Sequence, residues 1–400
     1  MSVNTLMAPA LASRISCPVT SWSPVDTWRN RGGQTALLRR YGSRVARSSA
    51  APSRRTGMAE YAALDVSLQS TSVHIVDQQG RCVWRGKCPT DIAALSSTIR
   101  QHAPKVERVG LETGMLATWL YHGLAMARLP VVCKDARQAK AALSCRVNKT
   151  DANDAEGLAQ LLRTGFFRQV RVKSEATMQV RTLLSARRQL VCTELDLANQ
   201  IRGLLKIFGL LLPRGGGRLF EAAVRERLAG HRQLATVILP LLQAWRAIRE
   251  QVLALDRTAY AVAKRDARCQ LLQTAPGVGT ITALAYVAAV ERPEEFQNGR
   301  AVSAWVGLTP ARYQSGQIDY SGRISRQGDV HLRTYLYEAA NTVLTRSRAD
   351  SALKHWGLGL KARLGHKRAV VAVARKLAVI LHAMWAKGEP FKTDAVAAAV

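Results

Sequence analysis

The chain has 400 residues, of which 58 are Lys or Arg and 28 are Asp or Glu, giving a formal net charge of +30 and a pI near 10.8. A charge of this size favours polyanionic partners bound in a salt-sensitive way, although by itself it does not separate ribosomal, chromatin-like and membrane-surface roles. Seven scattered cysteines without a CxxC pair argue against a zinc site or a disulfide framework. The lack of a run of about 18 apolar residues argues against a membrane span. The sequence has no Walker-type loop, so ATP use is not indicated.

Residues 1–57 differ in composition from the rest of the chain. They contain nine Arg, no Lys and one acid, Asp26, and they are rich in Ser, Pro and Ala. An Arg-rich, acid-poor leader superficially resembles an organellar transit peptide, but it lacks the apolar core of a signal peptide. Because the patterned part of the chain begins at Met58, we expect residues 1–57 to be a disordered, dispensable basic extension.

The next segment reads as an α/β sheet that carries two acids at strand ends. β-branched and aromatic enrichment with turn punctuation predicts short strands at 61–66, 71–77 and 81–86, and a further strand at 106–113 that leads into a helix over 115–127. Asp65 lies near the end of the first strand. Glu112 lies at the strand-to-helix junction, the carboxyl edge at which such folds place ligands.

Two more acids open a helix predicted from residue 151 onward. Asp151 and Asp154 are three residues apart and therefore project from one face of its first turn. Together with Asp65 and Glu112 they are able to form one cluster, and carboxylate oxygens are the ligands that Mg²⁺ and Mn²⁺ prefer. The four acids thus indicate metal-dependent phosphodiester chemistry on a nucleic acid. The alternative is that Asp151 is a helix N-cap, Asp154 a first-turn acid and Glu112 a solvated turn residue.

Long helices are predicted between about 174 and 268. Apolar residues recur at three- and four-residue intervals, and a Pro- and Gly-rich break at 213–217 divides the segment into two helical stretches. An antiparallel hairpin, a coiled coil that joins subunits and a plain helical spacer all fit this pattern. No even heptad register favours the coiled coil.

The segment 271–290 breaks at a Pro-Gly-Val-Gly turn and resumes as an apolar helix, which is typical of a helix-hairpin-helix element. Gly277 and Gly279 would let the backbone approach a phosphate at the N-terminus of the following helix. An ordinary helix-helix turn has the same pattern.

The stretch 312–376 is strongly basic, and we interpret Arg323, Arg326 and Arg333 within it as nucleic-acid contacts. A solvated helix face is the alternative, but acids that would pair with these charges are sparse.

Several of these motifs, in this order, resemble one known family, the bridge-RNA-guided transposases of the IS110 insertion-sequence family, which are relatives of the DNA invertase Piv. The resemblance covers most of residues 59–388, and its motifs are YAALDVS, GLETG, KTDANDAEGLA, LLQTAPGVGTITA, AWVGLTP and YQSGQIDYSGRISRQGDVHLRTYL. It implies that Asp65, Glu112, Asp151 and Asp154 are the DEDD metal-binding tetrad of a RuvC-like domain. None of the four positions departs from the family pattern.

The resemblance also implies a serine nucleophile in the C-terminal domain, for which Ser315 and Ser325 compete. We favour Ser315, because it lies in a polar, Gly-containing turn that exposes a hydroxyl, whereas Ser325 could simply open the helix predicted over 331–344. Most serines in such contexts are turn or cap residues. A nucleophilic serine would form a phosphoserine intermediate that conserves bond energy for rejoining.

The fold class expected is α/β plus all-α. It comprises a RuvC-like (ribonuclease-H-like) N-terminal domain, a long helical coiled-coil spacer and a mainly helical C-terminal transposase domain with a helix-hairpin-helix-like element. The expected boundaries are 1–57 for the extension, 58–172 for the catalytic domain, 173–268 for the spacer, 269–388 for the transposase domain and 389–400 for a tail.

The expected partners are the donor and target DNA ends of the element and a bridge RNA that pairs with them, in a dimer or tetramer acting in the bacterial cytoplasm at the nucleoid, with no membrane. Two other functions fit the residues. A Holliday-junction-type, structure-selective endonuclease would hydrolyse DNA without Ser315, and a non-catalytic DNA-binding protein would bind DNA without metal-dependent strand breakage.

Overall fold

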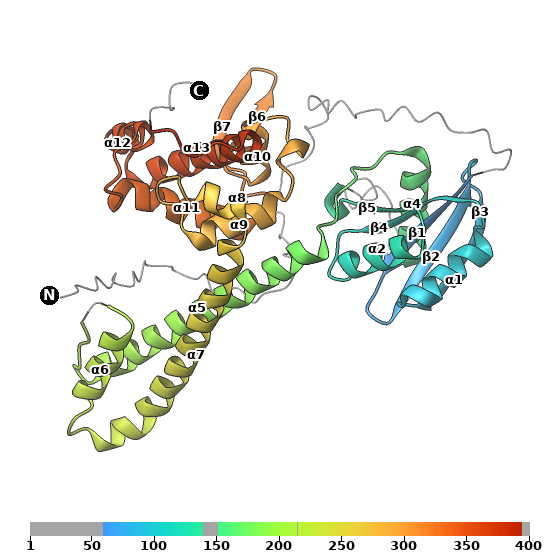
Figure 1. Cartoon of the computed structure of the whole chain (residues 1–400). Helices are drawn as coiled ribbons and strands as arrows, with labels where there is room; N and C mark the ends of the chain where they lie inside the picture. Colours follow the sequence, from blue (N-terminus) through green and yellow to red (C-terminus); the bar gives the residue numbers. More distant parts are fainter. Residues whose placement is uncertain (1–58, 139–150, 214, 394–400) are drawn as a thin grey trace. The chain divides into compact units, whose positions relative to one another are not determined.

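The chain folds into two compact units, with the boundary in the sequence between Glu175 and Ala176 (Figure 1). The computed structural model describes residues 59–138, 151–213 and 215–393, and within these it leaves out the side chains of 151–153. The predicted extension 1–57 and the end of the predicted tail, 394–400, lie outside the described residues. Each unit is considered by itself.

The N-terminal unit is built on a five-stranded sheet in the order β3-β2-β1-β4-β5. The first three strands pair antiparallel, and β4 and β5 continue the sheet parallel to β1. The strands are β1 (Glu60–Val66), β2 (Ser70–Asp77), β3 (Cys82–Pro89), β4 (Val106–Glu112) and β5 (Val131–Lys134). The first four confirm the predicted strands, whereas β5 is too short to give a clear periodic signal.

Helices cover both faces of this sheet, as its strand residues require. Ala62 and Leu64 of β1 pack in a core with α1 (Ile92–His102) and α2 (Ala117–Met126). The alternate residues Tyr61 and Ala63 pack against α4 (Asp151–Thr164) on the opposite face. Successive side chains of a strand point to opposite faces, so both sets are apolar in a sheet buried on both sides.

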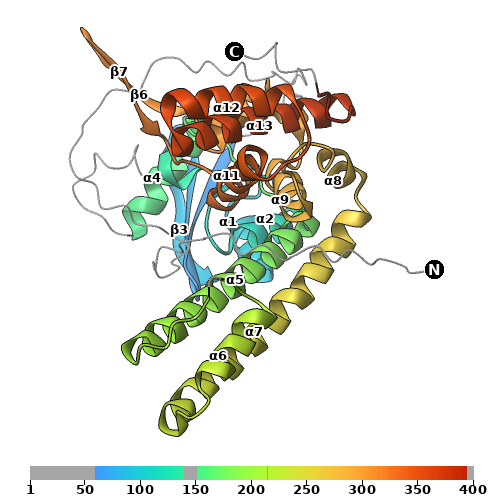
Figure 2. The same ribbon diagram turned by 90° about the vertical axis from the view of Figure 1, so that its left-hand side faces the viewer.

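The C-terminal unit begins with an antiparallel pair of long helices, α5 (Glu175–Ile207) and α7 (Arg232–Lys264) (Figures 1 and 2). Ion pairs join Arg187 to Asp256 and, at 2.8 Å, Arg249 to Glu194, so the two helices run in opposite directions. Of the three alternatives for this segment, the structure shows the antiparallel helical hairpin. The second stretch, predicted as one helical run, is in fact two helices, because Gly230 with φ +84° separates α6 (Arg218–Arg227) from α7.

The remainder of this unit is mainly helical and surrounds one apolar core. The buried helix α9 lies within it, and the Tyr286 hydroxyl of α9 donates a hydrogen bond of 2.9 Å to the Ala378 carbonyl oxygen. The elements are α8 (Ala267–Leu272), α9 (Thr280–Val290), η1 (Pro293–Glu295), α10 (Gly299–Trp305), β6 (Pro310–Ser315), β7 (Ile318–Ile324), α11 (Val330–Thr345), α12 (Ala352–Leu364) and α13 (His366–Lys387).

Among the described helices, α13 alone is long and apolar enough to cross a membrane by length and composition. In this fold its apolar residues, among them Val370, Val373, Leu377 and Leu381, are buried in the core of the unit. A core helix of a globular domain has the same composition as a membrane span, so the packing of α13 accounts for its apolar sequence.

Candidate functional site

Two predicted acids lie side by side at the carboxyl edge of the sheet. Asp65 is the last residue but one of β1, and Glu112 is the last residue of β4. Leu64 pairs with Leu111 in the parallel ladder, so the residues that follow them are neighbours across the two strands. The strand alternation places both acids on the face covered by α4, because Ala63 of β1 packs there.

The charges that act on Glu112 include that of a third predicted acid, Asp154. Burial raises the pKa of Glu112, the Lys134 ammonium opposes this, and the Asp65, Asp154 and Asp135 carboxylates raise the pKa further. Like charges shift the pKa of a carboxyl only when they are close to it. The fold therefore brings carboxylates from β1, β4, α4 and the end of β5 to one region.

The fourth predicted acid, Asp151, is the first residue of α4, and its side chain lies outside the described part of the chain. The backbone nevertheless places Asp151 at the N-terminus of α4. Asp154 follows it by three residues and is partly exposed.

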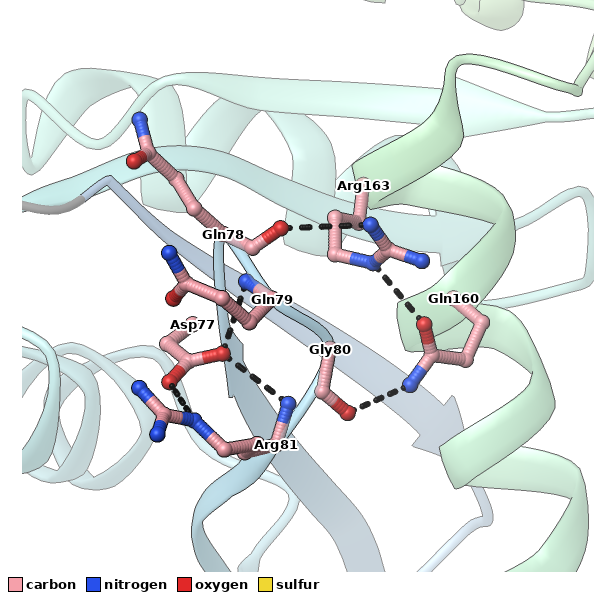
Figure 3. A network of polar contacts seen from close by, with 7 residues as sticks. All are labelled: Asp77, Gln78, Gln79, Gly80, Arg81, Gln160 and Arg163. Atoms are coloured by element: carbon pink, nitrogen blue, oxygen red, sulfur yellow. Dashed lines mark hydrogen bonds and ion pairs between the residues drawn. The ribbon is translucent and has the colours of Figure 1, made fainter.

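The far end of α4 is fastened by polar contacts to the turn between β2 and β3 (Figure 3). The Gln160 side-chain amide donates a 2.7 Å hydrogen bond to the Gly80 carbonyl oxygen, and the Arg163 guanidinium donates to the Gln78 carbonyl oxygen at 3.2 Å. Strand pairing places this turn beside the first residue of β1. Helix α4 therefore runs opposite to β1 and directs its N-terminal acids toward the edge that carries Asp65.

Close packing fixes the depth of α4 on the sheet. Leu158 and Leu162 of α4 are buried in the core beneath the helix. A Cβ atom at Gly110 of β4 would lie 2.3 Å from Leu162 Cδ1, so a larger residue at this position would force Leu162 or the helix to shift. The position of Asp154 thus depends on a glycine two residues before Glu112.

A buried lysine connects the cluster to α4. Lys134, the register partner of Glu112, has no exposed surface, and its Nζ donates a 3.2 Å hydrogen bond to the Leu158 carbonyl oxygen. Burial lowers the pKa of Lys134 to about 8, although Glu112 opposes this effect. Sequence reasoning missed both Lys134 and Asp135. The sequence feature that could have indicated them is that these two charged residues follow a short apolar run after a predicted helix, where a parallel strand is expected to end.

The donor atoms of the cluster are carboxylate oxygens, which suit hard divalent cations rather than soft ones. Within the described residues, no three His, Cys, Asp or Glu side chains already form a group able to hold a metal ion. Mg²⁺ or Mn²⁺ binding would relieve the repulsion that raises the pKa of Glu112.

The two candidate serines lie at different parts of a β-hairpin in the C-terminal unit. Ser315 is the exposed last residue of β6 and precedes Gly316, which has φ +55°, so its hydroxyl lies at an exposed turn as predicted. Ser325 follows β7, and its backbone N–H donates to the Thr309 carbonyl oxygen at 2.8 Å. The suggestion that Ser325 opens the following helix is wrong, because the Asp329 carboxylate caps α11.

The base of this hairpin is held firmly. Gly307, with φ +78°, approaches so closely that an added Cβ would lie 2.1 Å from the Gln327 carbonyl oxygen. The half-buried Arg333 guanidinium donates to the Val306 carbonyl oxygen at 2.7 Å and to that of Gln327 at 3.0 Å. Burial lowers the pKa of Arg333, which is thus occupied by backbone contacts at the hairpin base.

The other residues predicted to bind nucleic acid differ in their surroundings. Arg323 and Arg326 are exposed. Gly277 has φ +77° and packs against α11, where an added Cβ would lie 2.4 Å from the Ala339 carbonyl oxygen. Gly279 is the N-cap of α9 and has open space around it. The predicted pair of helices around the Pro-Gly-Val-Gly turn is present. The close packing of α11 explains why residue 277 is a glycine.

Two family models match the chain. A DEDD transposase model of the IS110 type matches residues 62–209, which include the four acids. The model of the IS116/IS110/IS902 transposase family matches residues 269–355, which include both candidate serines.

Individual relatives agree with these matches. The chain is 33% identical over 253 residues to the transposase for insertion sequence element IS1111A of Coxiella burnetii, covering 62% of this chain and 70% of that protein. It is 32% identical over 245 residues to a probable family 20 transposase of Pseudomonas aeruginosa, covering 59% and 72%. It is also 28% identical over 125 residues to a pilin gene-inverting protein of Moraxella bovis, covering 31% and 38%.

Proposed function

The chain belongs to the IS116/IS110/IS902 family of transposases, and from this premise we propose that it cleaves and rejoins DNA strands with a divalent-metal site and a serine nucleophile. It is an insertion-sequence transposase. The metal site belongs to the N-terminal unit and the serine to the C-terminal unit.

Asp65, Glu112, Asp151 and Asp154 would hold Mg²⁺ or Mn²⁺. The observation that supports this assignment is the pairing of β1 with β4, which places Asp65 beside Glu112 on the face covered by α4, the helix that carries Asp154. Burial and the Asp65 and Asp154 carboxylates also raise the pKa of Glu112. When bound, a divalent ion stabilises the negative charge that develops on the oxygens of a reacting phosphodiester. The acids themselves orient the ion, and the packed helix α4 holds their separation.

The N-terminal unit would be a RuvC-like, ribonuclease-H-like domain. Its support is the placement of one acid at the carboxyl end of each of two adjacent parallel strands, with a helix bearing two further acids on the same face of the sheet. Such an edge is where open α/β sheets place their ligands.

Ser315 would be the nucleophile. Its Oγ forms a bond to the scissile phosphorus, the phosphorus bond to one strand's oxygen breaks, and that oxygen leaves as a hydroxyl with the serine proton. Rejoining reverses the step: the hydroxyl of a second strand attacks the phosphoserine, and Ser315 regains its proton. The exposure of Ser315 at the end of β6 supports this role over Ser325, whose backbone is fixed at the base of the hairpin.

The partners would be the donor and target DNA ends and a bridge RNA, in a dimer or tetramer at the bacterial nucleoid. The formal charge of +30 supports the nucleic acids, because phosphate neutralisation by Lys and Arg drives such binding. The RNA and the assembly rest on the resemblance of the motifs to the bridge-RNA-guided family.

Recombination of donor and target plasmids, in cells supplied with the RNA that flanks the element, tests the proposal. Asp154→Ala and Ser315→Ala should each abolish the joined product, and Ser315→Ala should also abolish the trapped protein–DNA adduct. Ser321→Ala is the matched control, because Ser321 is another exposed serine of the same hairpin. Joining by Ser315→Ala would shift the nucleophile to Ser325 or water, and joining by Asp154→Ala would refute the metal site.

A further inference from the structure

Two tyrosines form an exposed stack on the hairpin that carries Ser315. Tyr313 of β6 and Tyr320 of β7 are register partners, with ring centroids 5.0 Å apart and an angle of 22° between the rings. Their exposed fractions are 54% and 56%. Figure 2 shows the hairpin extending away from the helices of its unit. The stack therefore presents aromatic surface to the surroundings.

Ser315 lies on the same face of the hairpin as this stack. Successive residues of a strand alternate between faces, so Tyr313 and Ser315 share one face with their register partners Tyr320 and Ile318. Two residues span about 7 Å along a strand. The candidate nucleophile thus lies beside an aromatic and apolar surface, because Ile318 is also exposed, at 60%.

The opposite face of the hairpin is polar. Arg312 pairs with Asp319 there, with a distance of 2.8 Å between Arg312 Nε and Asp319 Oδ1. Arg323 follows on the same face and is exposed. A two-stranded hairpin with large aromatic groups on one face and an exposed arginine, Arg323, on the other has the composition of a surface that binds a polyanion with stacking bases.

We propose that Tyr313 and Tyr320 form a stacking platform for unpaired DNA bases and hold the adjoining phosphate beside Ser315. This inference rests on the proposed function of Ser315. Nucleic acid is favoured as the occupant of this surface, because a net charge of +30 attracts phosphates. The platform would position the DNA and take no part in bond formation. The strand register places its two rings on the same face of the hairpin as Ser315.

Binding of a fluorescein-labelled, 20-nucleotide single-stranded DNA of mixed sequence to the full chain, followed by fluorescence anisotropy, tests the platform. Replacing both Tyr313 and Tyr320 by Leu should weaken binding by about tenfold or more, because base–aromatic stacking is lost, without changing the salt dependence that phosphates cause. Replacing both by Phe should leave binding unchanged. Tyr260→Leu is the matched control, because Tyr260 is a 59% exposed tyrosine of α7.

A second measurement is independent of any loosening of the hairpin by the Leu variants. Irradiation of wild-type protein bound to the same DNA containing 5-iodouracil should give cross-links that mass spectrometry maps to Tyr313 or Tyr320. Cross-links only at other residues would overturn the platform. So would unchanged binding of the double Leu variant, an equal loss in the Tyr260→Leu control, or a change in oligomeric mass of the Leu variant at unaltered DNA affinity.

These outcomes are separable from failure of the proposed function. A Ser315→Ala variant that still joins DNA, together with weakened binding of the double Leu variant, would reject the nucleophile and keep the platform. Loss of joining in Ser315→Ala, together with unchanged DNA binding by the double Leu variant and no tyrosine cross-link, would keep the nucleophile and reject the platform.

Discussion

The substitution Gly110→Ala should disturb the acid cluster through the packing of α4. The added Cβ would lie 2.3, 2.5 and 2.7 Å from three side-chain atoms of Leu162. Carbon atoms in contact are normally separated by about 3.5–4.0 Å, so the helix or the leucine must move by roughly 1 Å. Such overpacking costs about 1–3 kcal/mol. The better strand propensity of alanine offsets about 0.5–1 kcal/mol of this, which leaves a net loss of up to about 2.5 kcal/mol.

Hydrogen exchange followed by mass spectrometry on peptides of β4 and α4 measures this local loss. Exchange of those peptides should be faster in Gly110→Ala than in the wild type, with peptides of the C-terminal unit unchanged. The affinity for Mn²⁺, measured by calorimetry, should fall as well, because the displaced α4 carries Asp154 away from Glu112.

A compensating variant provides the control. Leu162→Ala alone should cost about 2–5 kcal/mol by leaving a cavity. In the double variant the new methyl group occupies part of that cavity. The loss of stability of the double variant should therefore be smaller, by about 1–3 kcal/mol, than the sum of the losses of the two single variants. Strict additivity of the two substitutions, or undiminished Mn²⁺ affinity in Gly110→Ala, would refute the argument that this contact positions the acids.

Three further predictions follow from buried polar groups. Because the folded-state pKa of Glu112 is raised, ionised Glu112 opposes folding, so metal-free Glu112→Gln should unfold at higher urea concentration than the wild type at neutral pH. This advantage should shrink as the pH falls to the ordinary glutamate value, and excess Mn²⁺ should remove it at neutral pH. The pKa of Asp329 is lowered although burial opposes this, because Arg181 lies 2.8 Å away and the Leu332 N–H donates to it. Asp329→Asn should therefore cost about 1–2 kcal/mol at neutral pH, and the deficit should vanish as the pH falls from the ordinary aspartate value through the lowered one; a pH-independent deficit in urea unfolding would contradict this. Tyr286→Phe removes a buried hydrogen bond to a carbonyl oxygen and should cost about 1–2 kcal/mol, and a wild-type melting temperature would contradict this.

Local sequence patterns were sufficient for the elements whose periodicity is strong. The apolar run at 61–66, the apolar strand ending at Glu112 and the helical spacing after Asp151 each predicted an element that the structure confirms. The break at Gly230 was missed, because the apolar periodicity continues on both sides of it. The hairpin β6–β7 was expected only as a turn, because its short strands are exposed and contribute almost nothing to the buried core.

The sequence by itself determined which residues carry charge, hydroxyl and aromatic groups, and where along the chain strands and helices begin. Their convergence was decided only by the tertiary structure. Parallel pairing of β1 with β4 places Asp65 beside Glu112, and the packing of α4 against Gly110 brings Asp154 to them from more than 40 residues away. Lys134 entered the cluster for the same reason. Side-chain periods report neighbours within one element, whereas contacts between elements depend on register and close packing that no local pattern contains.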